Sequence, residues 1–459
     1  MTELEIKELV KNQRTYFRTN ATLPVSKRIE ALKKLHASIK KHEGEINEAL
    51  KKDLGKSTTE GFMCEIGLTL SEISYMIKHV KSYAKEKDVH TPLVHFHSRS
   101  FRKPSPYGVV LIMSPWNYPF LLTMDPLVDA LAAGNTVIIK PSAYSPYTSE
   151  IVKRIIEECF DKKYVAVVTG GRAENNHLLN EHFDYIFFTG SKEVGKYVME
   201  KASAHLTPVT LELGGKSPCI VDETANLKVT AARIAFGKYL NCGQTCVAPD
   251  YLYCHESIKD ELLKEIKKQI TKMYGKDPLK NDDYGKIINE KHFNRVKGLI
   301  DEKKVIHGGY SDDEALRIAP TVMDNITWND AIMQEEIFGP ILPVLTFSSL
   351  DEAINTVNNR EHPLALYIFS SNKNNIRRVT SECGYGGGCI NDTIIHLASS
   401  EMDFGGFGES GMGSYHGKHG FDTFTHYKSI VDKKTWLDLP MRYQPYKGLY
   451  EKMMRFFLK

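Results

Sequence analysis

The apolar run Val109-Val110-Leu111-Ile112-Met113 decides the fold class, because it is the first of four short segments rich in β-forming residues. The later segments cover residues 136–139, 165–168 and 185–188, and stretches long enough for a helix separate them, such as residues 149–160. Continuous apolar strands that alternate with helices are typical of a parallel sheet covered on both faces. We therefore predict an α/β protein with a doubly wound, Rossmann-like nucleotide-binding sheet.

The segments on either side of this series have different patterns. Apolar residues recur at helical spacing in the first hundred residues, for example at Ile29, Leu32, Leu35 and Ile39. Residues 94–101 alternate apolar and polar positions, which predicts an exposed strand or hairpin, and Pro104 and Pro106 follow as punctuation of the chain. A second αβ series follows Glu212. It includes an amphipathic helix predicted to begin at Ser257, with an apolar face formed by Ile258, Leu262, Ile266, Ile270 and Met273.

Composition limits the class of protein. A chain of 459 residues is long for one core, so two or three sub-domains are expected. Apolar residues make up 42% and charged residues 25%, which excludes a disordered or fibrous protein. The formal net charge is only +3, so the sequence predicts no nucleic-acid-binding surface.

The same sequence indicates a reducing compartment. Eight cysteines in a chain of this length do not form a disulfide framework. Residues 1–20 have no apolar core like that of a signal peptide, and no apolar run is long enough to cross a bilayer. We expect a cytoplasmic protein with no integral membrane segment.

Two glycines flank a predicted strand-to-helix turn after residue 188. Gly190 permits a tight turn, Gly195 permits close packing of a helix on the sheet, and the free N–H groups at the helix start suit a pyrophosphate. The spacing is not that of the usual dinucleotide fingerprint, so the turn alone fits a plain αβ junction better. Lys140 follows the strand at 136–139, where it could hold ribose hydroxyls or simply be solvated.

Four further residues are candidates for catalysis or metal binding. Cys242 and Cys246 lie four residues apart, but no matching Cys or His pair completes a metal site, so none is predicted. Glu212 lies in an apolar run, where a raised pKa would suit a general base, although an ordinary strand-end glutamate fits equally well. Asn117 follows the strand at 109–113 and could donate to an oxyanion or serve in a turn.

Taken in order, these segments resemble the aldehyde dehydrogenase superfamily. The resemblance covers nearly the whole chain and rests on residues 115–119, 140–142, 188–195, 212–216, 243–246, 335–340 and 404–413. Residues 391–392, 410–417 and 442–446 are similar to the class 3 branch, and so is the short N-terminal segment. Class 3 enzymes act on medium- and long-chain aliphatic or aromatic aldehydes and are dimers. Residues 453–459 are expected to be too short for the membrane anchor that some members carry.

The resemblance also implies a role for each candidate residue. Cys246 is the nucleophile that forms a thioester, Glu212 activates the hydrolytic water, and Asn117 with the N–H of Cys246 forms the oxyanion hole. The residues implied for NAD(P) binding are Lys140, Gly190, Ser191, Gly195, Glu336 and Phe338. Those implied for the aldehyde pocket are Tyr118, Leu122, Phe404 and His416.

Two positions depart from the family pattern. Many relatives have a glutamate three residues after the cofactor lysine, where this chain has Ala143. Loss of that carboxylate removes repulsion toward a 2′-phosphate, so we predict use of both NAD and NADP. Cys242 stands where a small polar residue is expected, and we interpret it as a spectator thiol rather than as a redox partner of Cys246.

The resemblance implies a division of the chain into parts. The NAD(P)-binding domain covers residues 1–84 and 104–212, and the catalytic domain covers residues 213–389. Residues 85–103 and 390–440 form a small β oligomerisation element, and residues 441–459 form a C-terminal tail. A homodimer with a small-molecule aldehyde substrate is expected.

Other functions explain the sequence less well. A cysteine hydrolase would use Cys246 but would leave the phosphate turn unexplained. A CoA-acylating dehydrogenase usually lacks the water-activating glutamate, so Glu212 favours hydrolysis. A catalytically silent binding protein of the same fold would not need the complete set of Cys246, Glu212 and Asn117.

Overall fold

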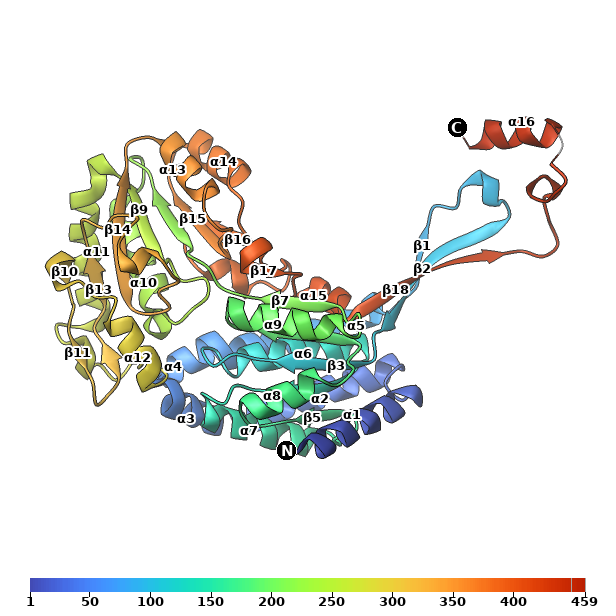
Figure 1. Cartoon of the computed structure of the whole chain (residues 1–459), viewed down its shortest axis with the longest axis horizontal. Helices are drawn as coiled ribbons and strands as arrows, with labels where there is room; N and C mark the ends of the chain where they lie inside the picture. The colour runs from blue at the N-terminus through green and yellow to red at the C-terminus, as the bar shows by residue number, and fades with distance from the viewer. Residues whose placement is uncertain (447, 459) are drawn as a thin grey trace.

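The structure, a computed structural model, describes residues 1–446 and 448–458; Lys447 and Lys459 of the predicted C-terminal tail lie outside the described residues. Two helix-covered sheets lie beside each other, and a long β arm projects away from them (Figure 1). The predicted α/β fold with a doubly wound parallel sheet is confirmed.

The first sheet has six strands in the order β17-β7-β6-β3-β4-β5. Its strands are β3 (Val109–Met113), β4 (Thr136–Lys140), β5 (Val165–Val167), β6 (Tyr185–Thr189), β7 (Val209–Glu212) and β17 (Gly411–Met412). All neighbouring pairs are parallel except β17 and β7. The four predicted strands lie within one residue of their expected bounds. The strand order reverses between β3 and β6, the point at which such sheets bind ligands beyond their carboxyl ends.

Helices from the first half of the chain cover this sheet (Figure 1). They are α1 (Glu3–Arg18), α2 (Val25–Lys41), α3 (Glu43–Leu54), α4 (Thr58–Gly61), η1 (Phe62–Ile66), α5 (Gly67–Tyr83), α6 (Leu121–Ala133), α7 (Pro146–Cys159), α8 (Arg172–Leu179) and α9 (Lys192–Ser203). Leu32, Leu35 and Ile39 of α2 are fully buried, as their spacing predicts, whereas Ile29 is only partly buried. Helix α7 begins three residues before the predicted start because proline fits the first turn of a helix.

The second sheet has seven strands in the order β10-β13-β14-β9-β8-β15-β16. Its strands are β8 (Pro218–Val221), β9 (Tyr251–His255), β10 (Val305–His307), β13 (Thr321–Met323), β14 (Ile341–Phe347), β15 (Ala365–Phe369) and β16 (Gly387–Ile390). The accompanying elements are α10 (Leu227–Tyr239), α11 (Lys259–Tyr274), α12 (Glu290–Lys297), α13 (Leu350–Asn358), α14 (Lys373–Glu382) and the small hairpin β11 (Ser311–Asp312) and β12 (Arg317–Ile318). The chain passes from the first sheet to the second between Glu212 and Pro218.

The predicted start of α11 at Ser257 is wrong by two residues. Residues Glu256–Ile258 form a separate 3-10 turn, η4, and α11 begins at Lys259. Ser257 bonds to the ring of His255 instead of capping the helix. Met273, predicted on the buried face, is 38% exposed because it lies in the last turn, beyond the part of α11 that packs on the sheet.

The projecting arm contains β1 (Lys87–Val89), β2 (Ser98–Pro106) and β18 (Thr425–Lys433), in the order β1-β2-β18. Strand β2 begins at Ser98, after residues Leu93–His95, which form a 3-10 turn, η2. Strands β1 and β2 pair as an antiparallel hairpin around this turn, so the hairpin alternative predicted for residues 94–101 is confirmed. Pro104 and Pro106 lie within β2. Strand β1 pairs only with residues 100–102, so Pro104 and Pro106 lie where β2 has a free edge and a missing N–H is tolerated.

The remaining C-terminal elements pack in different places. Residues Gly411–Met412, which lie in the segment predicted for the oligomerisation element, pair with β7 in the first sheet. The last helices are α15 (Gly417–Thr423) and α16 (Gly448–Phe457), and α16 lies at the far end of the arm (Figure 1). Within the described residues, no helix is both long and apolar enough to span a membrane.

Candidate active site

Cys246 lies in a tightly held loop between α10 and β9. The preceding residues Asn241 and Cys242 have left-handed backbone angles, with φ of 51° and 52°. Such angles are uncommon for residues other than glycine and persist where the surroundings fix them. Gln244 provides part of this restraint, because its side-chain amide donates to the carbonyls of Asn241 and Lys286, each at 3.0 Å. The loop therefore holds the Cys246 thiol in a defined place.

The surroundings of Cys246 favour its protonated thiol. Burial raises the pKa of Cys246 most, the nearby carboxylates of Glu336 and Glu212 raise it further, and the backbone N–H groups of Cys246 and Val247 oppose the shift. The thiolate is the reactive form of a cysteine nucleophile. A nearby base is therefore needed to remove the thiol proton, and the carboxylates of Glu336 and Glu212 are the neighbouring groups that could accept it.

Glu212 is the last residue of β7 and is buried, with 2% of its surface exposed. Neither carboxylate oxygen has a hydrogen-bond partner among the described residues. Burial raises the pKa of Glu212 well above its usual value, and the charge of Asp403 raises it further. An unpartnered, buried carboxyl close to a thiol has the properties expected of a general base or acid.

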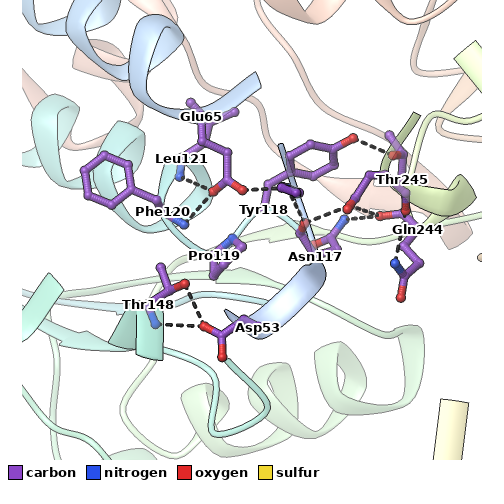
Figure 2. A network of polar contacts seen from close by, with 12 residues as sticks. Asp53, Glu65, Asn117, Tyr118, Pro119, Phe120, Leu121, Thr148, Gln244 and Thr245 are labelled. Carbon is purple, nitrogen blue, oxygen red and sulfur yellow. Dashed lines mark hydrogen bonds and ion pairs between the residues drawn. The ribbon is translucent and has the colours of Figure 1, made fainter. Parts of the chain in front are cut away.

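Asn117 lies beyond the end of β3 and faces the Cys246 loop from the first sheet. Its side-chain amide donates to the carbonyl of Gln244 at 3.0 Å, which leaves its second N–H for another acceptor (Figure 2). Its own carbonyl accepts a hydrogen bond from the side chain of Asn241 at 2.8 Å. Asn117 is buried, with 3% of its surface exposed, so its position relative to the Cys246 loop is fixed by both contacts.

An apolar cavity leads to the thiol. Cys246 lines it together with Tyr118, Leu122, Phe404 and His416, the four residues predicted for the aldehyde pocket. The other lining residues are Met63, Cys64, Leu68, Leu121, Phe236, Leu240, Thr245, Ile394, Ile395, Leu397, Ala398 and Tyr415. None of these residues carries an acidic or a lysine or arginine side chain. A cavity of this composition suits an apolar ligand.

Several residues predicted to bind the cofactor lie at or just beyond the carboxyl ends of β4 and β6. Lys140 is buried and donates to the carbonyls of Pro141 and Gly170, at 2.9 and 2.7 Å, and burial lowers its pKa to about 8. Ser191 is the N-cap residue of α9, yet its side chain does not cap the helix. A Cβ at Gly195 would lie 2.7 Å from a Leu213 methyl carbon, which shows how closely α9 packs on the strand. The uncommitted hydroxyl and helix start suit a pyrophosphate.

Glu336 approaches the same region from the second sheet. A Cβ at Gly214 would lie 2.1 Å from its carboxylate oxygen Oε2, so the glycine makes room for this side chain. Burial raises the pKa of Glu336 to about 8, with Asp250 contributing. Phe338 has a left-handed φ of 48°, and its ring meets that of Trp116 edge to face. The structure thus brings Glu336 near both Gly214 and Cys246.

Comparison with known proteins decides the family. The family model described as "Aldehyde dehydrogenase family" matches residues 1–430. The chain belongs to this family. The 4,4′-diaponeurosporen-aldehyde dehydrogenase of Staphylococcus aureus is 50% identical over 448 residues, which are 97% of this chain and 98% of the relative. The dimeric NADP-preferring aldehyde dehydrogenase of the dog, Canis lupus familiaris, is 43% identical over 443 residues, 96% of this chain and 98% of the relative.

A solved structure is similar over nearly its whole length. It is described as the substrate-bound state of an aldehyde dehydrogenase from Staphylococcus aureus, and it covers 98% of this chain and 99% of its own. The TM-score is 0.97 and the sequence identity 49%. The predicted family and activity are confirmed: this aldehyde dehydrogenase is an oxidoreductase that converts an aldehyde to the acid, and its family uses NAD(P).

Sequence reasoning missed several residues of the aldehyde dehydrogenase site. Met63, Cys64 and Leu68 line the cavity from η1 and α5, and Lys56 contacts the Asn117 carbonyl. They come from a part of the chain in which apolar spacing predicts only a helix, and no motif marks them. A buried lysine can be recognised only when its surroundings in the fold are known.

The pKa of Cys246 leads to a prediction about its reactivity. Because the pKa is raised, the thiolate fraction should rise about tenfold for each pH unit between pH 7 and 9. Alkylation of Cys246 by iodoacetamide is therefore expected to accelerate by the same factor, as measured by mass spectrometry of its peptide. A rate that levels off below pH 8 would contradict the raised pKa.

Proposed function

We propose that this aldehyde dehydrogenase oxidises a medium- or long-chain aliphatic or aromatic aldehyde through a thioester on Cys246. One observation carries the proposal: the thiol lies at an apolar cavity and beside Glu212, a buried carboxyl with no hydrogen-bond partner among the described residues. A nucleophile and a base in one water-poor site are the groups that acyl formation and hydrolysis require.

The side chains divide the chemistry between them. The Cys246 thiolate adds to the aldehyde carbon, and the second N–H of the Asn117 amide and the N–H of Cys246 stabilise the resulting oxyanion. NAD(P), when bound, supplies the hydride acceptor that turns this adduct into the thioester. Glu212 then removes a proton from water, whose oxygen attacks the thioester carbon and releases the acid and the free thiol.

The residues beyond the carboxyl ends of β4 and β6, together with Glu336 and Phe338, fit the dinucleotide. The buried ammonium group of Lys140 can donate hydrogen bonds to ribose hydroxyls. The Ser191 hydroxyl and the N–H groups at the start of α9 can hold the pyrophosphate near Gly190. Glu336 can accept hydrogen bonds from the nicotinamide ribose, with Phe338 beside the ring. The lack of a side-chain partner for Ser191 in its capping position supports this assignment.

The chain is proposed to use both NAD and NADP. The exposed Ala143 lies three residues after Lys140, and no carboxylate at this position repels a 2′-phosphate. The name of the dog relative, which states that it prefers NADP, supports use of the phosphorylated cofactor.

Ala143→Glu is expected to reverse this tolerance. A carboxylate at the ribose should raise the KM for NADP by about tenfold or more, since like charges at short range repel, and should leave the KM for NAD nearly unchanged. Initial rates at varied cofactor concentration measure both constants. Ala143→Gln has the same size without the charge and is the control. Equal changes in the KM for NAD and the KM for NADP would show that residue 143 does not lie near the 2′ position of the ribose.

A homodimer is also proposed. Strand β18 is nine residues long and has β2 as its only partner in the three-stranded sheet of the arm. The arm projects from the body of the molecule (Figure 1), and a long unpaired strand edge is a template for pairing with a second copy. The dog relative is named as dimeric.

A cytoplasmic location completes the proposal. All eight cysteines are free thiols, Cys242 among them, which is typical of proteins in a reducing compartment.

An absorbance assay of reduced cofactor tests the function directly. Aliphatic aldehydes of increasing length and aromatic aldehydes are offered with NAD or NADP, with and without CoA. We expect kcat/KM to rise with the apolar surface of the aldehyde, and we expect turnover to be independent of CoA. Turnover that requires CoA would indicate acyl transfer to CoA in place of hydrolysis and would remove the role of Glu212.

A further inference from the structure

A buried ion pair next to the site has no part in the mechanism above. Lys56 lies between α3 and α4, Glu65 lies in η1, and both side chains are completely buried. Lys56 Nζ and Glu65 Oε1 are 2.5 Å apart. Removing two charges from water costs about as much free energy as their attraction returns, so such a pair is a weak source of stability. Its contacts therefore need another explanation.

The contacts of Lys56 lead to the proposed oxyanion site. Its ammonium group donates to the main-chain carbonyl of Asn117 at 3.0 Å and lies 4.0 Å from the centre of the Tyr118 ring. The Tyr118 hydroxyl in turn lies 2.6 Å from that of Thr245, the residue before Cys246 (Figure 2). Lys56 thus touches the residue that supplies the amide donor and, through Tyr118, the loop that carries the nucleophile.

The contacts of Glu65 hold the other end of the same segment. Its oxygen Oε2 accepts from the backbone N–H groups of Phe120 and Leu121, at 2.8 and 3.3 Å, where α6 begins (Figure 2). These N–H groups have no partners within the helix. The segment from Asn117 to Leu121 is therefore fixed at one end by the ammonium group and at the other by the carboxylate.

The backbone around Glu65 is unusual. Residues Phe62–Ile66 form a π-helical turn between α4 and α5. Such turns are rare in proteins and occur frequently at functional sites. The same turn supplies Met63 and Cys64 to the wall of the cavity, so one backbone irregularity serves both the ion pair and the substrate wall.

We propose that Lys56 is a positioning residue for the oxyanion site, held in place by Glu65. Its ammonium group fixes the main chain of Asn117, so that the amide of this residue meets the aldehyde oxygen when the Cys246 thiolate adds. Lys56 itself touches neither substrate nor cofactor in this role. The inference rests on the proposed function, because it requires that Asn117 be an oxyanion donor.

A double variant separates positioning from general stability. Lys56→Met alone would leave the Glu65 charge buried without its partner, and Glu60, the other carboxylate facing Lys56, would remain as well. Lys56→Met with Glu65→Gln removes both charges of the pair, and the Gln amide oxygen can still accept from Phe120 and Leu121. The fold keeps its α6 contact, whereas the Asn117 carbonyl loses the charged donor of Lys56 and keeps only the neutral amide of Asn241.

Two reactions of Cys246 measure the effect in the full-length enzyme. The single-turnover rate of cofactor reduction with an aldehyde depends on the oxyanion site. Alkylation by iodoacetamide uses the same thiolate but forms no oxyanion. In the double variant we expect the single-turnover rate to fall about 10- to 100-fold, because small misplacements of a catalytic donor have effects of this size. Alkylation and the KM for NAD are expected to change less than about twofold.

Two further variants are measured beside it. Asn117→Ala removes the donor itself. Arg14→Met breaks the partly buried pair of Arg14 with Asp184. This pair lies at the start of β3 and β6, at the opposite end of these strands from the proposed site. The variant controls for the loss of an ion pair, and its single-turnover rate is expected to be unchanged. If the double variant is insoluble, Glu65→Gln alone loosens Lys56 and should lower the single-turnover rate about three- to tenfold with alkylation unchanged.

The outcomes distinguish the two proposals. A single-turnover rate within twofold of wild type in the double variant, with a large loss in Asn117→Ala, overturns the role of Lys56 only. Parallel losses of turnover and alkylation show collapse of the Cys246 loop and overturn it too. An Asn117→Ala enzyme with a normal single-turnover rate refutes the oxyanion assignment in the proposed function, and the role of Lys56 with it.

Discussion

Cys246→Ala is expected to abolish aldehyde oxidation, with kcat lowered by at least about 10⁴-fold, because alanine offers no nucleophile for the adduct. The side chain lies at the cavity and only partly contributes to the core, so the variant should fold normally. Steady-state absorbance of reduced cofactor measures the loss. Binding of NAD or NADP, measured by calorimetry without aldehyde, should be retained, since the proposed dinucleotide ligands lie on other segments.

Cys242→Ala is the matched control for this variant. Cys242 lies four residues earlier in the same loop, is 1% exposed, and has its sulfur near Gly285. Burial raises its pKa, and unlike Cys246 it is not among the residues that line the cavity, so a substrate in the cavity does not reach it. The variant should lose about 1 kcal/mol of stability through a small cavity and keep kcat within about threefold. Residual oxidation above about 1% in Cys246→Ala, or inactivity in Cys242→Ala, would mean that the nucleophile is misassigned.

The sequence predicts four of the six strands of the first sheet well because these four are short runs of mostly apolar residues, whereas β7 and β17 contain polar residues or glycine and are not predicted. The strand at Val109–Met113 is buried at every position. Five consecutive apolar residues would be unfavourable in an exposed segment, so this run indicates a strand in the interior of the sheet. The arm is predicted less well. Residues 94–97 alternate like a strand but form a turn, because alternation in four exposed residues is not tied to a core. The spacing of apolar residues therefore predicts a strand reliably only where every residue of the segment is buried.

Some residues of the candidate site could be predicted from the sequence and others could not. Cys246, Glu212 and Asn117 follow strand ends or lie in recognisable segments, and the structure brings them to one place. Lys56 and Glu65 have no signal, because what makes them unusual is complete burial in contact with a loop about 60 residues away in the chain. Their roles depend on long-range contacts, which spacing along the chain does not reveal.

Glu212→Gln is expected to separate the two halves of the reaction. The amide cannot take a proton from water, so the thioester on Cys246 should accumulate. Mixing enzyme with cofactor and aldehyde should give a rapid burst of reduced cofactor close to one per active site. Steady-state turnover afterwards should be about 10²- to 10⁴-fold slower than in the wild type. Stopped-flow absorbance measures the burst, and mass spectrometry of quenched enzyme detects the acyl group.

Glu336→Gln is the control for the loss of a carboxylate beside Cys246. Both carboxylates raise the pKa of the thiol, so both variants change its ionisation in the same direction. Of these two carboxylates, Glu212 has no hydrogen-bond partner among the described residues, whereas Glu336 accepts from the backbone N–H of Gly215 and is proposed to hold the ribose. Glu336→Gln should therefore weaken cofactor binding and show no accumulated thioester. Steady turnover without a burst in Glu212→Gln would show that another group activates the water, and a burst in both variants would assign the effect to charge alone.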